Sequence, residues 1–302
     1  MNCSGRSPLG KNFFSQAVSV FFYCNFFIAA CAAALLYETC YLLHLLPSMH
    51  WFILLSFFCT MNVYTFHYYL KCVTPVEDDR INWYRKHTSW IWLLLVIGAC
   101  VIAWLLITHF TFLFSHKNFL WTLFIPILSI GYSFPFLPGR RALRHLGWLK
   151  LPLLSFVWSF TTVSLPVLYS TANSVDRTQI QVLFINRFLF ILALCVLFNL
   201  RDYEEDKADK VMTPAVLLGP GKVLSIGKWI LSALNLIAGI LLAWVFHFHS
   251  SVAYAAIILP IVLLFLLFQF FSFSKTEMQF LFLNDGLMPV KALLLIFAIA
   301  IS

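Results

Sequence analysis

The strongest constraint on this chain is a series of apolar runs, each near the 20 residues that a helix needs to cross a bilayer. The chain is 62% hydrophobic and only 11% charged, a composition that leaves too much apolar surface for a water-soluble protein. We place nine runs, at 15–37, 49–70, 89–108, 119–137, 150–170, 180–199, 224–246, 251–272 and 286–302. The sequence therefore predicts an all-α, polytopic membrane bundle of about nine transmembrane helices, with residues 1–302 as one domain.

Lysine and arginine residues gather in alternate connections between these runs. With nine spans, 16 of the 20 fall on the side of the N-terminus, three fall on the other side, and Lys291 lies within the last run. Cytoplasmic loops are enriched in these residues, so we expect a multi-pass protein of a bacterial inner membrane with a cytoplasmic N-terminus. The net charge of +8 then reflects topology and lipid headgroups, and no nucleic-acid partner is expected.

Lys291 is the one strong ionisable candidate inside a predicted span. Such a group is costly in a membrane and is by default functional. Asp285 lies six residues earlier, too far for a same-face pair on a helix, so we expect the counter-charge elsewhere. The eight cysteines include no CxxC pair, and we predict small core residues rather than disulfides or zinc ligands.

An acidic run follows the sixth apolar segment, at residues 199–219 (NLRDYEEDKADKVMTPAVLLG). On a helix, Asp202, Asp206 and Asp209 share one face within an arc of roughly 60°, and Asn199 lies one turn earlier. Oxygen ligands of this kind suit Mg²⁺ that is bound together with substrate phosphates. The alternative is a hydrated, charged loop between two membrane helices.

Two other connections on the basic side carry polar clusters. Residues 62–90 include Asn62 and His67 near a helix end, and residues 131–150 combine Tyr132 with several cations. Carboxylates that face cations across a bundle would bind a diphosphate, with Mg²⁺ bridging the two sets of oxygens. The same arrangement would stabilise a departing diphosphate.

The acidic run resembles the second aspartate-rich motif of the UbiA superfamily of intramembrane prenyltransferases. That motif reads [D/N]xxDxxxD, then a basic residue and a Thr-Leu-Pro-like stretch that leads to Leu-Gly, and the run 199–219 follows this form. The segments 132–135 (YSFP) and 143–150 (LRHLGWLK) are similar to the family's connection between its fourth and fifth helices. Residues 284–287 (NDGL) resemble the Asp-Gly that opens its last helix.

The family's first motif, NxxxDxxxD, is degenerate in this chain. The matching frame gives Asn62, Phe66 and Leu70, so the asparagine is present and both acids are missing. Candidate replacements lie at a neighbouring histidine and in the loop that follows, provided that the loop folds back. They are His67, Glu77, Asp78 and Asp79.

The resemblance implies transfer of an isoprenyl group from a prenyl diphosphate to an aromatic or other lipid-pathway acceptor that is hydrophobic. It implies Asp202 and Asp206 as catalytic residues, with Mg²⁺ as the cofactor. The implied metal ligands are Asn199, Asp202, Asp206 and Asp209, and the candidates for binding the diphosphate are Lys207, Arg141, Arg144, Lys150 and Tyr132. Because the first-motif acids are missing, the alternative is a catalytically inactive UbiA-like protein that binds lipids or isoprenoids. A transporter is disfavoured, since no internal repeat is apparent.

Overall fold

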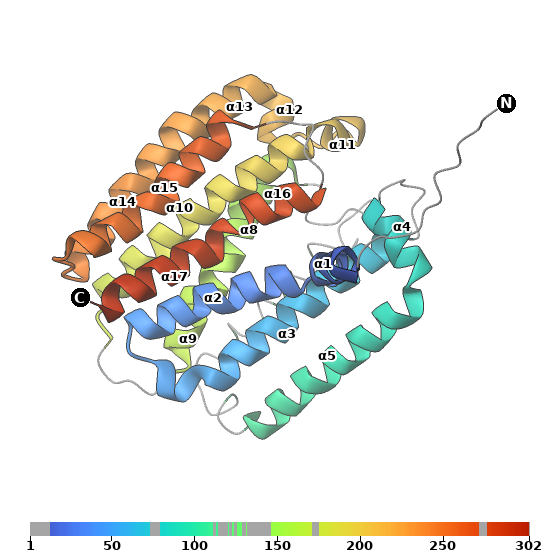
Figure 1. Cartoon of the computed structure of the whole chain (residues 1–302), viewed down its shortest axis with the longest axis horizontal. Coiled ribbons are helices and arrows are strands. Elements are labelled where there is room, and N and C mark those ends of the chain that lie inside the picture. Colours follow the sequence, from blue (N-terminus) through green and yellow to red (C-terminus); the bar gives the residue numbers. More distant parts are fainter. Residues whose placement is uncertain are drawn as a thin grey trace.

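The structure is a computed structural model that describes residues 13–72, 79–110, 146–170, 175–271 and 277–301, with a few isolated positions between 113 and 131. All regular secondary structure in these residues is helical, and most helices run roughly along one direction (Figure 1). The predicted all-α membrane bundle is confirmed.

The helices differ widely in length, and short helices cap one end of the long ones. In chain order they are α1 (Phe13–Tyr23), α2 (Phe26–Leu42), α3 (Leu46–Lys71), α4 (Asp79–Lys86), α5 (Thr88–Thr108), α8 (Lys150–Ser159), α9 (Leu165–Leu168), α10 (Arg177–Arg201), α11 (Tyr203–Ala208), α12 (Pro214–Leu218), α13 (Pro220–Ile226), α14 (Ser232–Val245), α15 (Ser251–Gln269), α16 (Glu277–Asn284) and α17 (Leu287–Ala300). Turns of π-helix at Phe160–Ser164 and Gly227–Leu231 join α8 to α9 and α13 to α14.

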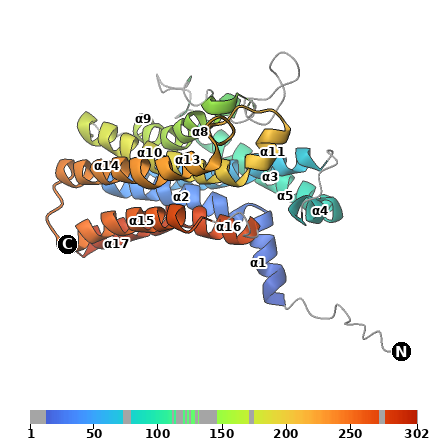
Figure 2. The ribbon, with the colours of Figure 1, turned by 90° about the horizontal axis from the view of Figure 1, so that it is seen from above.

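Within the described residues, seven helical units are long and apolar enough to cross a membrane, and α2 is a shorter apolar helix. Each of these eight overlaps one of the nine predicted runs, with different bounds at the first and last, while the run 119–137 lies mostly outside the described residues. The chain is therefore a multi-pass membrane protein, with its orientation still a prediction. Helices α4, α11 and α16 lie at one end of the bundle, which we call the polar end (Figures 1 and 2).

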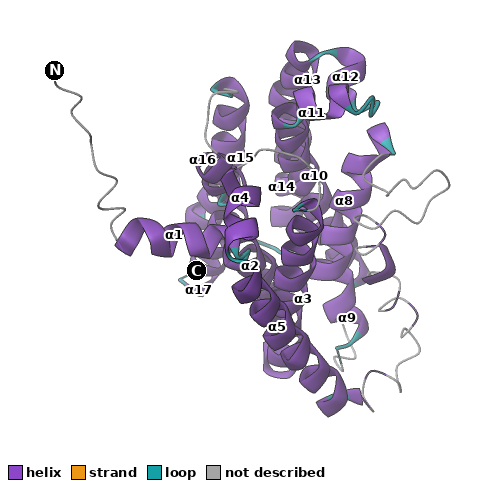
Figure 3. Ribbon diagram, turned by 90° about the vertical axis from the view of Figure 1, so that its right-hand side faces the viewer, coloured by secondary structure: helices purple, strands orange, loops and turns teal. Residues whose placement is uncertain are grey.

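The predicted unbroken helix over 15–37 is wrong, because α1 and α2 meet at a sharp break. Asn25 has a left-handed backbone with φ of 62°, a conformation that asparagine tolerates better than most residues. Its buried side chain donates hydrogen bonds to Thr65 Oγ1 at 3.1 Å and to the Tyr84 hydroxyl at 3.0 Å. Figures 2 and 3 show α1 turned away from the axis of α2, which leaves carbonyl groups at the end of α1 free for other partners.

The last predicted run, 286–302, begins too late, since the helical unit starts at Glu277 and is interrupted at Asp285 and Gly286. A side chain at position 286 would overlap the carbonyl oxygen of Phe282, so this joint between α16 and α17 requires glycine. The interruption points Asp285 inward, where it is 2% exposed.

The long helices enclose a buried ion cluster, in which Glu38 is the counter-charge of Lys291. Lys291 Nζ lies 2.9 Å from Glu38 Oε1, and Arg187 Nη2 lies 2.9 Å from Glu38 Oε2. Arg187 Nη1 also donates to the Leu35 carbonyl at 2.9 Å and to Thr162 Oγ1 at 3.1 Å, within the first π-helical turn. We call Glu38, Arg187 and Lys291 the membrane triad; it joins α2, α10 and α17.

Candidate functional site

A cavity lies among α2, α3, α8, α10 and the α16–α17 joint. Its apolar lining is supplied by Phe22, Phe27, Ile28, Leu154, Trp158, Ile191, Leu194, Phe198, Leu281 and Met288. Its polar lining consists of Asn25, Tyr64, Tyr68, Arg80, Cys195 and Asp285. The cavity thus suits a mainly apolar molecule that carries a polar group.

Arg80 is held by the break between α1 and α2. Arg80 is 2% exposed, and its Nη2 atom donates to Asn25 Oδ1 at 2.6 Å and to the carbonyls of Phe22 and Tyr23 at 3.2 and 3.3 Å. The hydroxyl of Tyr84, on the same short helix α4, donates to the Tyr23 carbonyl at 2.7 Å. The carbonyls that the break frees therefore fix a cation in the wall of the cavity.

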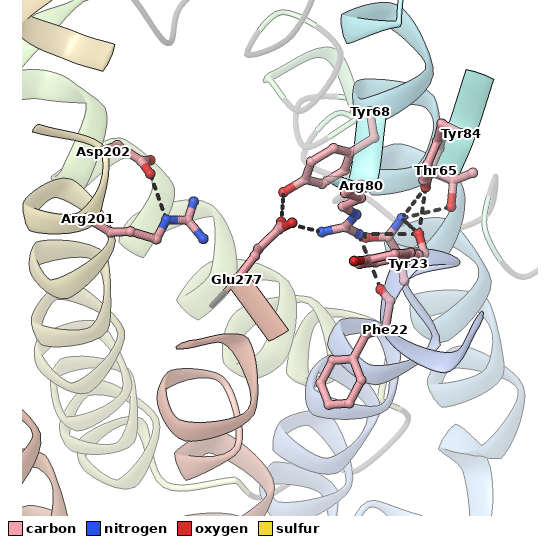
Figure 4. Close-up of polar contacts among 10 residues, drawn as sticks. Phe22, Tyr23, Thr65, Tyr68, Arg80, Tyr84, Arg201, Asp202 and Glu277 are labelled. Carbon is pink, nitrogen blue, oxygen red and sulfur yellow. Dashed lines mark hydrogen bonds and ion pairs between the residues drawn. The ribbon is translucent and has the colours of Figure 1, made fainter. Parts of the chain in front are cut away.

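The other side of Arg80 faces Tyr68 and Glu277. Arg80 Nη1 lies 3.1 Å from Glu277 Oε1, and its guanidinium carbon lies 3.5 Å from the centre of the Tyr68 ring (Figure 4). The Tyr68 hydroxyl donates to the same Glu277 oxygen at 3.4 Å. Burial alone would lower the pKa of Arg80, but Tyr68 and Glu277 outweigh it and raise that pKa, so Arg80 is charged.

A second guanidinium reaches the same region from the end of α10. Arg201 Nε lies 2.8 Å from Asp202 Oδ1, and the guanidinium carbon lies 5.0 and 5.1 Å from the ring centres of Phe198 and Phe280. Figure 4 shows this guanidinium directed from α10 toward Glu277. Arg80 and Arg201 therefore approach Glu277 from opposite sides.

Several buried polar atoms in this region have no hydrogen-bond partner among the described residues. They include Arg201 Nη1, Glu277 Oε2 and Asp285 Oδ1. An unsatisfied buried polar group costs about 1–3 kcal/mol, and more when it is charged, so native proteins rarely leave one without a reason. We call Arg80, Arg201, Glu277 and Asp285 the cavity cluster; Arg80 and Asp285 line the cavity itself. The unsatisfied atoms of the cluster are available to a ligand or to solvent.

The second motif is compact but its polar atoms are already engaged. Asn199 Nδ2 donates to Asp206 Oδ2 at 3.0 Å, and Asn199 Oδ1 accepts the Ala215 N–H at 3.1 Å. The predicted proximity of Asn199 and Asp206 is confirmed. Asp202 lies at the turn between α10 and α11, whereas Asp209 and Lys207 are exposed.

Lys150, which the sequence offers as a candidate for binding the diphosphate, forms an ion pair with Asp206 of the second motif. Its Nζ atom lies 3.2 Å from Asp206 Oδ1 and 3.4 Å from Asp206 Oδ2. Burial raises the pKa of Asp206 above its ordinary value of 3.8, while Lys150 opposes that rise. Both oxygens of Asp206 are thus occupied by Asn199 and Lys150.

The first-motif frame does not face the cavity. Asn62 Nδ2 donates to the Leu95 carbonyl at 3.4 Å, and the Asn62 side chain packs against Gly98 on α5. His67 does not line the cavity, and Asp79 is exposed at the start of α4. Asp78, Tyr132, Arg141 and Arg144 lie outside the described residues.

The face of α3 that does line the cavity carries Tyr64 and Tyr68, one helical turn apart. Sequence reasoning missed this pair and the whole cavity cluster except Asp285, which was considered as a partner of Lys291 and as part of the Asp-Gly that opens the family's last helix. Two signals were available. Tyrosines at i and i+4 in an apolar helix share a face, and Glu277 is one of only 12 acidic residues in the chain.

Magnesium binding can be tested against these positions. Within the described residues, no three His, Cys, Asp or Glu side chains are grouped as a metal site would require. Asp202 is the second-motif acid that fits best, because Arg201 engages only its Oδ1 atom and the side chain is 24% exposed. Mg²⁺ is often held by one or two carboxylates plus substrate phosphates, so Asp202 can supply the protein ligand.

Comparison with known proteins supports the architecture. No protein-family model matches the chain, and no curated protein sequence matches it either. Among solved structures, a UbiA homolog from Archaeoglobus fulgidus bound to GPP and Mg²⁺ is similar, with a TM-score of 0.57 and 14% sequence identity. The match covers 94% of this chain and 99% of that one. At this identity the similarity shows the fold alone, and the protein described here has a UbiA-like fold.

Proposed function

We propose that the cavity binds a prenyl diphosphate and that the protein transfers the prenyl group to a hydrophobic acceptor within the membrane. The observation that carries the proposal is a largely apolar cavity whose lining includes the Arg80 guanidinium. A second guanidinium, that of Arg201, lies nearby at the end of α10 and has an unsatisfied Nη1 atom. Guanidinium groups bind phosphate oxygens with directed, charge-assisted hydrogen bonds.

The prenyl chain would lie along the apolar lining. Phe27, Leu154 and Ile191 contribute hydrocarbon surface, and the burial of each methylene group is worth about 0.8 kcal/mol. Trp158, whose Nε1 donates to the Tyr64 hydroxyl at 3.3 Å, offers an aromatic surface. Aromatic faces attract cations, which would favour the allylic cation that forms as diphosphate leaves.

The charges around the cavity explain why a divalent cation belongs to the proposal. Of the charged groups that pair around the cavity, the cations Arg80, Lys150 and Arg201 are outnumbered by the carboxyl groups of Asp202, Asp206, Glu277 and Asp285. A diphosphate therefore needs more positive charge than these side chains supply. When bound, Mg²⁺ would neutralise diphosphate oxygens and favour departure of the diphosphate.

Within this proposal Asp202 is the metal ligand that requires least rearrangement. Asn199 and Asp206 would have to exchange their present hydrogen bonds for the metal, and Asp209 would have to turn inward. Lys207, Arg141, Arg144 and Tyr132 remain candidates for binding the diphosphate. Arg201 Nη1 and the guanidinium of Arg80 would hold the charge that develops on the leaving diphosphate.

An inactive isoprenoid-binding protein is the second candidate, and one observation favours it. Tyr64 and Tyr68 occupy the cavity face of α3, so this wall offers phenol groups and no carboxylate. Such a protein would bind the same ligand without consuming it.

A single assay separates the two candidates. Purified protein in nanodiscs is incubated with radiolabelled geranyl diphosphate and a panel of aromatic and polyprenyl acceptors, with Mg²⁺ or with EDTA. We expect Mg²⁺-dependent release of inorganic diphosphate, abolished in Asp202→Ala and Asp206→Ala variants that retain the wild-type unfolding temperature. Saturable binding without release across the panel would support the inactive candidate. Absence of saturable binding would overturn both.

A further inference from the structure

The membrane triad contains two cations and one carboxylate. Arg187 and Lys291 share Glu38, each at 2.9 Å. The ionisable groups that influence Lys291 most strongly are Glu38, which attracts its charge, and Arg187, which opposes it. The Phe190 ring, centred 5.6 Å from Lys291 Nζ, attracts the ammonium but adds no net charge. With all three groups ionised, the triad therefore has an excess positive charge, which is costly inside a membrane bundle unless an anion balances it.

A second cavity lies beside Lys291, among α10, α14, α15 and α17, and it is smaller than the cavity described above. Its charged and polar lining consists of Lys291, Asn186 and Asn235, which are 8%, 4% and 2% exposed. An ammonium group can donate three hydrogen bonds, and Lys291 Nζ uses one of them, to Glu38. Lys291 therefore has donors left for an ion or molecule in this cavity.

Asn186 is the second group available to a ligand in this cavity. Its Oδ1 atom is buried without a partner, and no described residue forms a hydrogen bond with its Nδ2 atom. Because no hydrogen bond fixes the amide in one orientation, it can turn its N–H groups or its oxygen toward the cavity. Asn235 differs, since its Nδ2 atom donates to the carbonyls of Leu189 and Leu231 at 3.2 and 2.9 Å.

We propose that this second cavity binds a small monovalent anion of the size of chloride, held between Lys291 Nζ and the Asn186 amide. The anion would neutralise the triad and connect it to the α14 and α15 walls of the cavity. Water could accept the same hydrogen bonds but would leave the excess charge, and electrostatic energies are largest where the dielectric constant is low. A phosphate group needs more donors than these two side chains supply.

This site is separate from the proposed diphosphate site, and the inference does not depend on prenyl transfer. The second cavity shares no lining residue with the first. The anion would have a structural role, because its binding would stabilise the folded state in proportion to the logarithm of its concentration once the site is filled.

The test uses chloride as the probe, with purified protein in detergent. Thermal unfolding is followed in sodium chloride and in sodium gluconate of equal ionic strength, and binding of radiolabelled chloride is measured at equilibrium. We expect about one chloride ion to bind saturably per protein. The unfolding temperature of the wild type should be higher by about 3 °C or more in about 150 mM chloride than in gluconate.

Three variants locate the site. Lys291→Met leaves Glu38 and Arg187 as a neutral pair and should abolish saturable chloride binding. Asn186→Leu keeps all three charges and should weaken chloride binding about threefold to tenfold, through the loss of one hydrogen bond to a charged group. Lys222→Met, which removes an exposed lysine of α13, is the matched control and should bind chloride as the wild type does.

Absence of saturable chloride binding to the wild type would overturn the inference. Binding of wild-type affinity in a folded Lys291→Met variant would also overturn it, because the ion would then lie elsewhere. If Lys291→Met does not fold, Asn186→Leu decides by the same measurement, and an unchanged affinity would overturn the site.

Discussion

The membrane triad and the cavity cluster are both sets of buried charges, but they differ in how fully their atoms are paired. In the triad, Glu38 uses both oxygens at 2.9 Å, and the two Nη atoms of Arg187 make four hydrogen bonds. Arg187 Nε is the triad's one unsatisfied atom within the described structure. The cavity cluster has unsatisfied atoms on Arg201, Glu277 and Asp285.

This difference separates a structural role from a binding role. A buried charge whose atoms are nearly all paired recovers much of its desolvation cost inside the protein, and the triad thereby ties α2, α10 and α17 together. A cluster next to a cavity whose donors and acceptors are not all used within the protein can form hydrogen bonds with a ligand. The predictions below change one region and leave the other as the control.

The largest effect is expected in the triad. Arg187→Gln should lower the free energy of unfolding by about 3–5 kcal/mol, because it leaves the Glu38 carboxylate without its principal partner in a buried position. Thermal unfolding in detergent measures the loss. The double variant Glu38→Gln with Arg187→Gln should be less destabilised than Arg187→Gln alone. A loss below about 1 kcal/mol in the single variant would show that the triad is not structural.

The next effect is expected in the cavity cluster and concerns binding. Arg201→Gln should weaken binding of geranyl diphosphate by roughly ten- to a hundredfold, the value of one or two charge-assisted hydrogen bonds. Its stability should change by less than about 1 kcal/mol, because the side chain is partly exposed and its ion pair with Asp202 is near the surface. Unchanged affinity would remove Arg201 from the site.

A smaller effect distinguishes the two faces of α3. Tyr68→Phe removes the hydroxyl that donates to Glu277 at 3.4 Å and should weaken geranyl diphosphate binding about threefold to tenfold, since the ring under Arg80 remains. Asn62→Ala, directed toward α5, should leave affinity unchanged. Equilibrium binding of geranyl diphosphate to both variants checks this. A larger loss of affinity in Asn62→Ala than in Tyr68→Phe would show that Asn62, the remaining residue of the first motif, belongs to the site.

The smallest effect is a pH dependence of stability at Asp206. Its pKa is raised in the folded protein by burial, so the folded state binds its proton more tightly than the unfolded state. This contribution to stability is complete below the ordinary value of 3.8 and is lost as pH rises through the raised pKa. Relative to Asp206→Asn, the wild type should therefore lose stability as the pH is raised across this interval. If the free energies of unfolding of the wild type and Asp206→Asn changed with pH in parallel, the raised pKa of Asp206 would be contradicted.

The helices themselves were predictable from sequence, and their interruptions were not. A run of apolar residues reports length and burial, so eight of the nine predicted runs have matching helices in the described part of the chain. The break at Asn25 depends on Thr65, Tyr84 and Arg80, which are distant in sequence. The residues of 15–37 alone therefore do not predict the break.

The site was predictable only where its residues are close in sequence. Asn199 and Asp206 are seven positions apart and do meet, at 3.0 Å. The ion pair between Arg80 and Glu277 joins residues 197 positions apart, a separation that no spacing rule addresses. The face of α3 that points toward the cavity also could not be predicted, because the helix is almost uniformly apolar. The sequence favoured the face with Asn62, whereas the face with Tyr64 and Tyr68 lines the cavity.

Binding of geranyl diphosphate to a variant with a filled cavity tests the central claim most directly. Leu194→Trp places bulk inside the cavity, and Ile185→Trp places the same side chain on the 52% exposed outer face of the same helix. We predict saturable binding, one molecule per protein, by the wild type and Ile185→Trp, and at least about a tenfold loss in a folded Leu194→Trp variant. Equal binding by all three, or binding by none, would contradict the assignment of this cavity to a prenyl diphosphate.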